Sequence, residues 1–315
     1  MKPLETLVYY PGKGDEYREL LTKYVGDAIR LVVCDDESEI WDAIREAEVL
    51  LVATSFPTRC FAEARRVRWI QALGAGVERF VASGIPEGSV LTRVNTGFGP
   101  LIGEYVFGHL LASTQRIRRI AQAQSERKWR PVPVEHLRGE MLGVAGMGAI
   151  GSVIATRAKA FEMTVWGLDL QCPSHPALDR GFEMGQLAAF LASLRYLVLC
   201  LPLTELTRSM FGADQFRGMR DDAILVNVAR GALVIEEDLV NALRTGEIHG
   251  AILDVFIEEP LPESSPLWSL PNAVVTPHTA GPSVPAEMVE FFGRNLVRFL
   301  NDEPLEGLVD VRRGF

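Results

Sequence analysis

The chain has 315 residues, of which 48% are hydrophobic, and its formal charge is −9 at pH 7. This length favours two domains, and the apolar content is that of a globular protein rather than a disordered one. The negative charge argues against nucleic acid or an anionic membrane as a partner, because both require a basic surface.

The N-terminal stretch "MKPLETLVYYPG" lacks the features of a secretory signal, and no apolar run is long enough to span a bilayer. The four cysteines lie far apart and form no CxxC pair; they are Cys34, Cys60, Cys172 and Cys200. Their spacing predicts neither a zinc site nor a disulfide framework, but free thiols in a reducing compartment. We therefore expect a cytoplasmic protein without a bound metal and without a membrane partner.

Short apolar runs alternate with helix-like segments in the first third of the chain. The strand candidates are "TLVYY", "IRLVV", "VLLVATS" and "VRWIQALG", and the segments between them are "DEYRELLTKYV", "ESEIWDAIREA" and "TRCFAEARR". This alternation predicts a parallel sheet with helices on both faces. The continuous apolar runs indicate strands that are buried on both sides.

The segment from Leu101 to Arg127 contains no proline and predicts one long helix, whose apolar first half must be buried. A second alternating series runs from "EMLGVAG" to "AVVTPH", and the helix "PAEMVEFFGRNLVRFLND" follows it. We expect this last helix to return to the first domain, which is then discontinuous. The sequence thus predicts two doubly wound α/β domains with parallel sheets, one of residues 1–96 with 283–315 and one of residues 97–282.

The stretch "GVAGMGAIGS" contains the pattern Gly146-x-Gly148-x-x-Gly151 between an apolar strand and a helix. In this setting the first glycine permits a tight turn, the second allows close approach of a pyrophosphate, and the third allows the helix to pack on the strand. The helix that opens at Ala149 and Ile150 offers N–H groups and a positive dipole end to the phosphates. We predict a dinucleotide site here; a bare strand-to-helix turn is the alternative.

The next strand, "MTVWGLD", ends in Asp169, about 20 residues further on, where the dinucleotide fingerprint expects an acidic residue. A carboxylate there accepts hydrogen bonds from both ribose hydroxyls and repels a 2′-phosphate. The following "LQCPSHP" contains no Arg or Lys to hold such a phosphate. We therefore predict NAD rather than NADP, although Asp169 could also simply cap the loop.

Three strand ends in the second series carry reactive side chains. "AILVNVARG" ends in Arg230, "GAILDVFIEEP" carries Asp254 and the pair Glu258 and Glu259, and "AVVTPHTAG" carries His278. Ligands of an open parallel sheet bind beyond the carboxyl ends of its strands. We therefore expect these side chains to lie around one crevice.

This set of side chains fits the reduction of a 2-keto acid. NADH supplies a hydride and an imidazolium supplies a proton to the carbonyl oxygen. A carboxylate beside His278 would orient its ring and favour the charged form, and Arg230 would hold the substrate carboxylate through two parallel hydrogen bonds. Spacing alone does not choose between Glu258 and Glu259, and each residue could instead be an ordinary surface or loop side chain.

The chain resembles the D-isomer-specific 2-hydroxyacid dehydrogenases, which include D-lactate, glyoxylate/hydroxypyruvate and phosphoglycerate dehydrogenases. The resemblance rests on "LRGEMLGVAGMGAIG", "LCLPLTELTRSMF", "ILVNVARGALVIEEDLVNAL", "GAILDVFIEEPLP" and "VVTPHTAG", in the family's order and spacing. It implies two Rossmann-like domains, the first (1–96 with 283–315) binding substrate and the second (97–282) binding NAD. It also implies a homodimer formed through the second domain.

The resemblance implies roles for further residues. Arg230, Glu259 and His278 would be the catalytic set, which selects Glu259 over Glu258. The backbone N–H groups of Ala75 and Gly76, in "LGAGVE", would meet the substrate carboxylate. The remaining cofactor contacts would be Leu201, Pro202 and Thr207 on the adenosine side, Val228 and Ala229 at the nicotinamide ribose, and Asp254 at the carboxamide.

The chain also departs from the family. The family often has Arg where this chain has Ala149, which removes one possible phosphate contact, and the segment "NTGFGPLIGEYV" is unusual. Our hypothesis is an NADH-dependent reductase of a small 2-keto acid such as glyoxylate, hydroxypyruvate or pyruvate. Two alternatives stay open: an NAD-responsive scaffold like the family's transcriptional corepressors, and an oxidoreductase of phosphite or a phosphorylated sugar acid.

Overall fold

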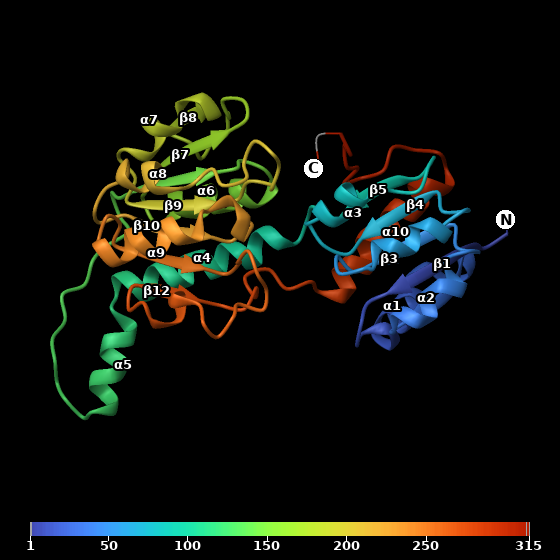
Figure 1. Cartoon of the computed structure of the whole chain (residues 1–315), viewed down its shortest axis with the longest axis horizontal. Helices are drawn as coiled ribbons and strands as arrows, with labels where there is room; N and C mark the ends of the chain where they lie inside the picture. Colours follow the sequence, from blue (N-terminus) through green and yellow to red (C-terminus); the bar gives the residue numbers. More distant parts are fainter. Residues whose placement is uncertain (1, 313, 315) are drawn as a thin grey trace. The chain divides into compact units, whose positions relative to one another are not determined.

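The computed structural model describes residues 2–312 and 314 of the chain. These residues fold as two compact units, of which unit 1 is Met1–Gly97 with Ser283–Phe315 and unit 2 is Phe98–Pro282 (Figure 1). Each unit is an α/β fold around a parallel sheet, and unit 1 is discontinuous in sequence, so the predicted fold class is confirmed. No helix in the described part of the chain is long and apolar enough to cross a membrane.

Unit 1 is built on a five-stranded parallel sheet in the order β2-β1-β3-β4-β5. The strands are β1 (Leu4–Tyr9), β2 (Ile29–Cys34), β3 (Val49–Val52), β4 (Trp69–Ala72) and β5 (Val90–Arg93). The helices are α1 (Gly14–Val25), α2 (Glu37–Ala43), α3 (Glu78–Ser83) and α10 (Pro285–Leu300), with short 3-10 turns at Gly26–Ala28 and Thr58–Glu63. The segment "TRCFAEARR", which we predicted as a helix like its neighbours, forms only the second of these turns.

The final helix α10 packs on unit 1 through both apolar and polar contacts. Its Phe292 ring stacks on Trp69 of β4 at a centroid separation of 5.0 Å. Its buried Asn295 donates a hydrogen bond to Gln71 of β4 at 3.1 Å. The last segment of the chain then bonds to β5, where the Arg93 N–H donates to the carbonyl oxygen of Gly307. These contacts explain why unit 1 is closed by a segment so distant in sequence.

Unit 2 is built on a seven-stranded parallel sheet in the order β12-β11-β10-β9-β6-β7-β8. The strands are β6 (Met141–Ala145), β7 (Thr164–Asp169), β8 (Arg180–Glu183), β9 (Tyr196–Leu199), β10 (Ile224–Asn227), β11 (Gly250–Leu253) and β12 (Ala273–Val275). The helices are α4 (Phe98–Thr114), α5 (Ile117–Ser125), α6 (Ala149–Ala160), α7 (Leu187–Leu191), α8 (Ala213–Arg217) and α9 (Glu236–Thr245). Short 3-10 turns lie at Met184–Gln186, Gly231–Leu233 and Pro266–Ser269. The order reverses between β6 and β9, and the glycine motif follows β6.

The helix predicted over residues 101–127 is wrong as a single element. The chain forms α4 and α5, and Arg116 between them has a left-handed backbone with φ of 54°. Neither glycine nor proline marks this break. The Glu135 N–H donates to the carbonyl oxygen of Thr114, and the Gln115 side chain donates to the carbonyl oxygen of Glu135. These contacts from a later segment end α4 where the local sequence would continue it.

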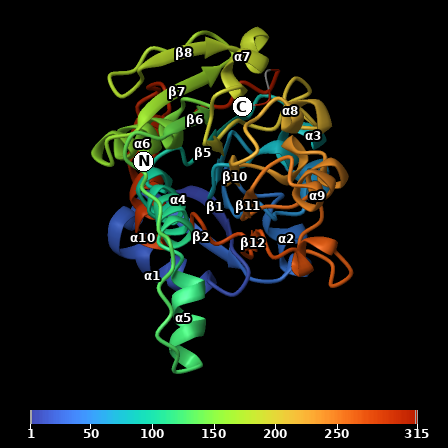
Figure 2. The same cartoon turned by 90° about the vertical axis from the view of Figure 1, so that its left-hand side faces the viewer.

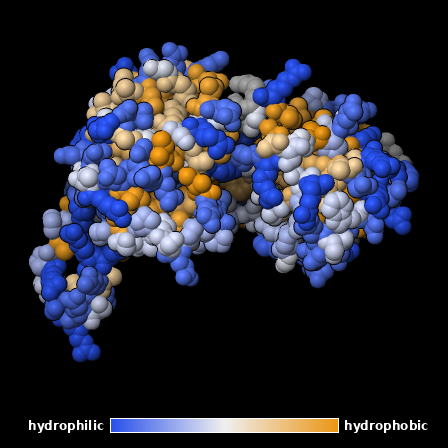
Figure 3. All heavy atoms as spheres, viewed as in Figure 1, coloured by the Kyte–Doolittle hydropathy of each residue, from blue (hydrophilic) through white to orange (hydrophobic). Residues whose placement is uncertain are grey.

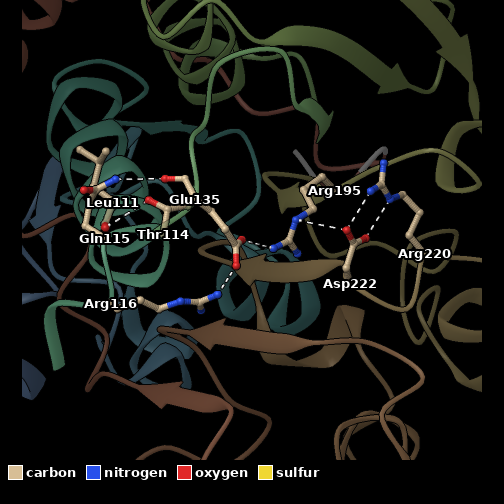
Figure 4. Close-up of polar contacts among 8 residues, drawn as sticks. All are labelled: Leu111, Thr114, Gln115, Arg116, Glu135, Arg195, Arg220 and Asp222. Carbon is tan, nitrogen blue, oxygen red and sulfur yellow. Dashed lines mark hydrogen bonds and ion pairs between the residues drawn. The ribbon is translucent and has the colours of Figure 1, made fainter. Parts of the chain in front are cut away.

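The segment of residues 117–134, called the arm below, begins with α5 and stands away from the rest of unit 2 in both cartoon views (Figures 1 and 2). Polar contacts close its base (Figure 4): Glu135 pairs with Arg116 and, at 2.7 Å, with Arg195. The arm carries hydrophobic side chains among hydrophilic ones (Figure 3). Its exposed large hydrophobic residues are Ile117, Ile120, Trp129 and Val134.

Candidate active site

The glycine loop of unit 2 connects β6 to α6 through a turn that requires glycine. Gly146 has a φ of +99°, and a Cβ atom there would lie 2.6 Å from the carbonyl carbon of Cys200. A Cβ at Gly151 would lie 1.9 Å from the carbonyl oxygen of Gly146. A Cβ at Gly148 would meet nothing within 4 Å, so the loop has open space beside the N-terminus of α6. This combination fits a pyrophosphate, which needs exposed N–H groups and room for two phosphates.

Asp169 lies at the carboxyl end of β7, next to the glycine loop. Its carboxylate accepts hydrogen bonds from the Met147 N–H at 2.8 Å and from the Leu170 N–H at 2.7 Å. It therefore does cap the loop, as the alternative interpretation held. An ionised carboxylate has about four acceptor positions, so these two bonds leave capacity for ribose hydroxyls, and that role stays a prediction.

The parallel register of the sheet adds a second carboxylate at this edge. Asp169 of β7 pairs with Glu183 of β8, whose side chain is exposed. Arg180 of β8 pairs with Trp166, nearer the opposite end of the strand pair, and its guanidinium lies over the Trp166 and Phe182 rings. The nearest strand thus offers a negative rather than a positive group beside Asp169.

Five further residues predicted to contact the cofactor, Leu201, Pro202, Thr207, Val228 and Ala229, lie after β9 and β10. Leu201, Val228 and Ala229 are buried. The Thr207 hydroxyl is committed to a turn, since it donates to the carbonyl oxygen of Pro202 at 2.6 Å and accepts from the Thr204 N–H at 2.9 Å. Ala149 and Ile150 form the first turn of α6. Their contacts with a cofactor remain predictions.

Arg230 follows β10 and is half-buried. Its backbone is shaped by the buried Asn227, whose side chain accepts from the Ala229 N–H at 3.1 Å and donates to the Arg230 carbonyl oxygen at 2.9 Å. A Cβ atom on Gly231 would lie 2.0 Å from the carbonyl carbon of Phe256. The turn that carries Arg230 therefore lies directly against the loop that leads to Glu259.

Glu259 and His278 contact each other across two loops of unit 2. The Nδ1 atom of His278 lies 2.7 Å from Oε2 of Glu259, and Oε1 of Glu259 accepts from the Phe256 N–H at 2.9 Å. Both side chains remain partly exposed, His278 by 54% and Glu259 by 35%. The neighbour Glu258 is exposed, and the carboxylate in contact with His278 is that of Glu259. The pair can hold an imidazole with its other nitrogen, Nε2, directed away from the carboxylate.

Asp254 is only 1% exposed and holds the turn that carries His278. Its carboxylate accepts from the Thr276 hydroxyl at 2.5 Å and from the N–H groups of Thr279 and Ala280 at 2.9 Å each. Its carbonyl oxygen accepts the His278 N–H at 3.0 Å. The structure thus gives Asp254 a positioning role, and its predicted contact with a nicotinamide carboxamide stays untested.

The loop that contains Ala75 and Gly76 lies in unit 1, after β4. Both residues are partly buried. The Arg93 guanidinium at the end of β5 donates to the carbonyl oxygen of Ala75 at 3.2 Å. Their role in binding a substrate carboxylate remains a prediction for this unit.

Sequence reasoning missed several residues that shape the site. Tyr105, Asn227, Gly231 and Thr276 were given no role there. Asn227 and Thr276 are polar residues at or just after the carboxyl ends of buried strands, which is a signal that the sequence does contain. Tyr105 lies on an apolar helix, and burial raises the pKa of its hydroxyl to about 12. Its hydrogen-bond partner, Thr276, follows β12 and could not be inferred from the sequence around Tyr105.

No group of three or more His, Cys, Asp and Glu residues among residues 2–312 and 314 is arranged to hold a metal ion.

The chain is similar to a known protein family and to individual proteins of known name. The model described as "D-isomer specific 2-hydroxyacid dehydrogenase, NAD binding domain" matches residues 107–280. A glyoxylate/hydroxypyruvate reductase A from Escherichia fergusonii is 34% identical over 263 residues, which are 80% of this chain and 83% of that protein. The family match covers the glycine loop, Asp169, Arg230, Glu259 and His278.

Solved structures give the same result. A D-isomer specific 2-hydroxyacid dehydrogenase family protein from Aeromonas salmonicida subsp. salmonicida A449 has a TM-score of 0.92 at 35% identity, covering 99% of this chain and 100% of that one. A D-isomer specific 2-hydroxyacid dehydrogenase from Xanthobacter autotrophicus Py2, solved with NADPH and MES, has a TM-score of 0.89 at 29% identity, covering 98% of this chain and 99% of that one. The similarity therefore extends over both units.

Proposed function

Because the chain belongs to the D-isomer specific 2-hydroxyacid dehydrogenase family, we propose that it is an NADH-dependent reductase of a small 2-keto acid. The product would be the D-2-hydroxy acid, and the substrates that we expect are glyoxylate and hydroxypyruvate, with pyruvate as a related candidate. The observation that carries the proposal is the 2.7 Å contact between His278 and Glu259 in the unit that holds the glycine loop. The family membership and the relative named as a glyoxylate/hydroxypyruvate reductase support the substrate class.

In the proposed mechanism His278 is the acid that protonates the carbonyl oxygen of the keto acid. Its Nδ1 atom donates to Glu259, so the proton moves to the substrate from Nε2. Glu259 is held by the Phe256 N–H, fixes the plane of the ring and balances the positive charge of the imidazolium. In the oxidative direction the same Nε2 atom accepts the proton of the hydroxy acid. Bound NADH would supply the hydride.

We propose that Arg230 anchors the substrate carboxylate. A guanidinium binds a carboxylate through two parallel N–H···O bonds, which fixes the orientation of the attached carbonyl. The buried Asn227 and the close packing of Gly231 hold the Arg230 backbone beside the loop that leads to Glu259. The N–H groups of Ala75 and Gly76 are proposed as further contacts of the same carboxylate.

We propose NADH rather than NADPH as the cofactor, bound at Gly146, Gly148 and Gly151. The support comes from the two carboxylates at the ends of β7 and β8, Asp169 and Glu183, because they would repel a 2′-phosphate. The Xanthobacter autotrophicus protein, one of the similar structures solved with NADP or NADPH, is 29% identical to this chain, so its cofactor does not determine this one.

Two properties of the whole protein are proposed with this function. The exposed hydrophobic side chains of the arm, with Trp129 97% exposed, support a homodimer formed through unit 2. The cysteines are all unpaired, which supports a location in the reducing cytoplasm.

A substrate panel tests the proposed function. The purified protein is mixed with glyoxylate, hydroxypyruvate, pyruvate and larger 2-keto acids, each with NADH and with NADPH, and cofactor oxidation is followed. We expect turnover with the small keto acids and a higher kcat/KM with NADH. If neither NADH nor NADPH were oxidised with any of these acids, the proposed reaction would be refuted. A higher kcat/KM with NADPH than with NADH would refute only the choice of cofactor.

A further inference from the structure

A partly buried hydrogen-bond chain runs from helix α4 to the turn that carries His278. The Tyr105 hydroxyl lies 2.7 Å from the Thr276 hydroxyl, which donates to Asp254 at 2.5 Å. Because the proton of Thr276 is directed to the carboxylate, its oxygen is left to accept the proton of Tyr105. Each donor in such a chain polarises the next one, so the bonds strengthen one another.

The turn at the end of this chain has a backbone that needs external support. His278 has a φ of +53°, in the left-handed region that a residue with a side chain adopts only under strain. Four hydrogen bonds from residues 276–280 to Asp254 hold the backbone there. The direction of the His278 ring toward Glu259 depends on this backbone, so whatever fixes Asp254 also fixes the acid–base pair.

Helix α4 is packed closely enough to be the fixed end of this series of hydrogen bonds. A Cβ atom on Gly281, just after the turn, would lie 2.9 Å from the Ile102 side chain of α4. On the other side, a Cβ atom on Gly99 of α4 would lie 2.9 Å from Val153 of α6. The helix therefore lies between the turn and the helix that follows the glycine loop, with Tyr105 as its polar contact to the turn.

We propose that Tyr105 is a positioning residue for the acid–base pair, acting through Thr276 and Asp254 on the turn that carries His278. The inference rests on the proposed function for its kinetic consequence. The Tyr105 hydroxyl bonds to Thr276 and not to Glu259 or the His278 ring; through Thr276 it restrains the backbone that aims the ring.

The first test compares Tyr105→Phe with Tyr196→Phe. Both residues are tyrosines of unit 2; Tyr196 is fully buried and Tyr105 is partly buried, but the Tyr196 hydroxyl has no hydrogen-bond partner among the described residues. We expect kcat for keto-acid reduction to fall about 3- to 10-fold in Tyr105→Phe, the effect of one lost neutral hydrogen bond, with KM for NADH unchanged. Tyr196→Phe should leave both parameters unchanged. An unchanged kcat in Tyr105→Phe, or an equal fall in both variants, would overturn the proposal.

A pair of substitutions at Thr276 tests the same chain if Tyr105→Phe folds poorly. Thr276→Val removes the hydroxyl and should lower kcat at least as much, whereas Thr276→Ser keeps it and should retain most of the activity. Equal losses in both variants would contradict a role for the hydroxyl.

Amide hydrogen exchange gives a readout that does not need turnover. The N–H groups of Thr279 and Ala280 should exchange about 3- to 10-fold faster in Tyr105→Phe than in the unchanged protein, and at the unchanged rate in Tyr196→Phe. If the unchanged protein reduced no keto acid, the proposed function would fail while this exchange still decided the role of Tyr105. Unaltered exchange of both amides in Tyr105→Phe would overturn the inference whatever the kinetics.

Discussion

At the scale of single residues, the site combines groups that the sequence could predict with contacts that it could not. Parallel strands end at one edge of a sheet, so Arg230, Asp254 and His278 could be assigned to that edge from the strand pattern alone. The choice of Glu259 over Glu258 needed more, because adjacent residues have the same spacing from every strand. In the structure the Phe256 N–H holds one oxygen of Glu259, and the other oxygen reaches His278.

The proposed preference for NADH over NADPH can be tested at Asp169. In Asp169→Ala the ratio of kcat/KM for NADPH to that for NADH should rise about tenfold or more. Two unit charges about 4 Å apart interact by about 1–4 kcal/mol near a protein surface, and this repulsion of a 2′-phosphate would be lost. Steady-state kinetics with both cofactors measures the ratio. Because Asp169 also caps the glycine loop, affinity for both cofactors should fall together, and only an unchanged ratio would contradict its discriminating role.

At the scale of elements, the sequence pattern predicted the helices and strands where apolar residues recur regularly. It failed where contacts with residues distant in the sequence determine where an element begins or ends. The alternation of strands and helices followed from apolar periodicity. Strand β8 was not identified, because "RGFE" is short and has a single large hydrophobic residue, Phe182. The break between α4 and α5 was missed because Glu135, remote from α4 in the sequence, supplies the contacts that end the helix.

The base of the arm yields a prediction about stability. Glu135 faces the Arg195 side chain, which is only 7% exposed, and also pairs with Arg116 (Figure 4). Glu135→Gln removes the charge but keeps the backbone contacts, so the free energy of unfolding should fall by about 1–3 kcal/mol in urea denaturation. The matched control is Glu162→Gln, whose pair with Arg138 is largely exposed and should contribute less than about 1 kcal/mol. Equal losses in the two variants would show that the Glu135 contacts do not hold the arm.

At the scale of the whole molecule, the sequence predicted two α/β units and the return of the last helix to the first of them. The buried Asn295 and Phe292 hold α10 against this unit, because their partners Gln71 and Trp69 lie in β4. What the sequence could not predict was the arm, because its apolar residues are too few and too irregular to distinguish an exposed segment from a buried one.

The proposed dimer can be tested through the exposed hydrophobic residues of the arm. Replacing Ile120 and Trp129 of the arm by serine should remove apolar surface from the interface and shift the protein from dimer to monomer. Light scattering after size-exclusion chromatography, over a range of protein concentrations, measures the change. If the double variant had the same dimer dissociation constant as the wild-type protein, the arm would be excluded as the interface. If the wild-type protein were a monomer, the dimer itself would be excluded.

The proposed role of the contact between Glu259 and His278 is tested most directly by comparing kcat for keto-acid reduction in Glu259→Gln and Glu258→Gln. Each substitution removes one carboxylate from the same loop with little change in shape, but only Glu259 contacts His278. We expect Glu259→Gln to lower kcat about tenfold or more, because a lost interaction worth about 1.4 kcal/mol in the transition state slows a reaction by that factor. Glu258→Gln should stay within about twofold of the unchanged protein, a difference of less than about 0.5 kcal/mol. Equal effects in the two variants, or a larger loss from Glu258→Gln, would contradict the proposed role of Glu259 as the partner of His278.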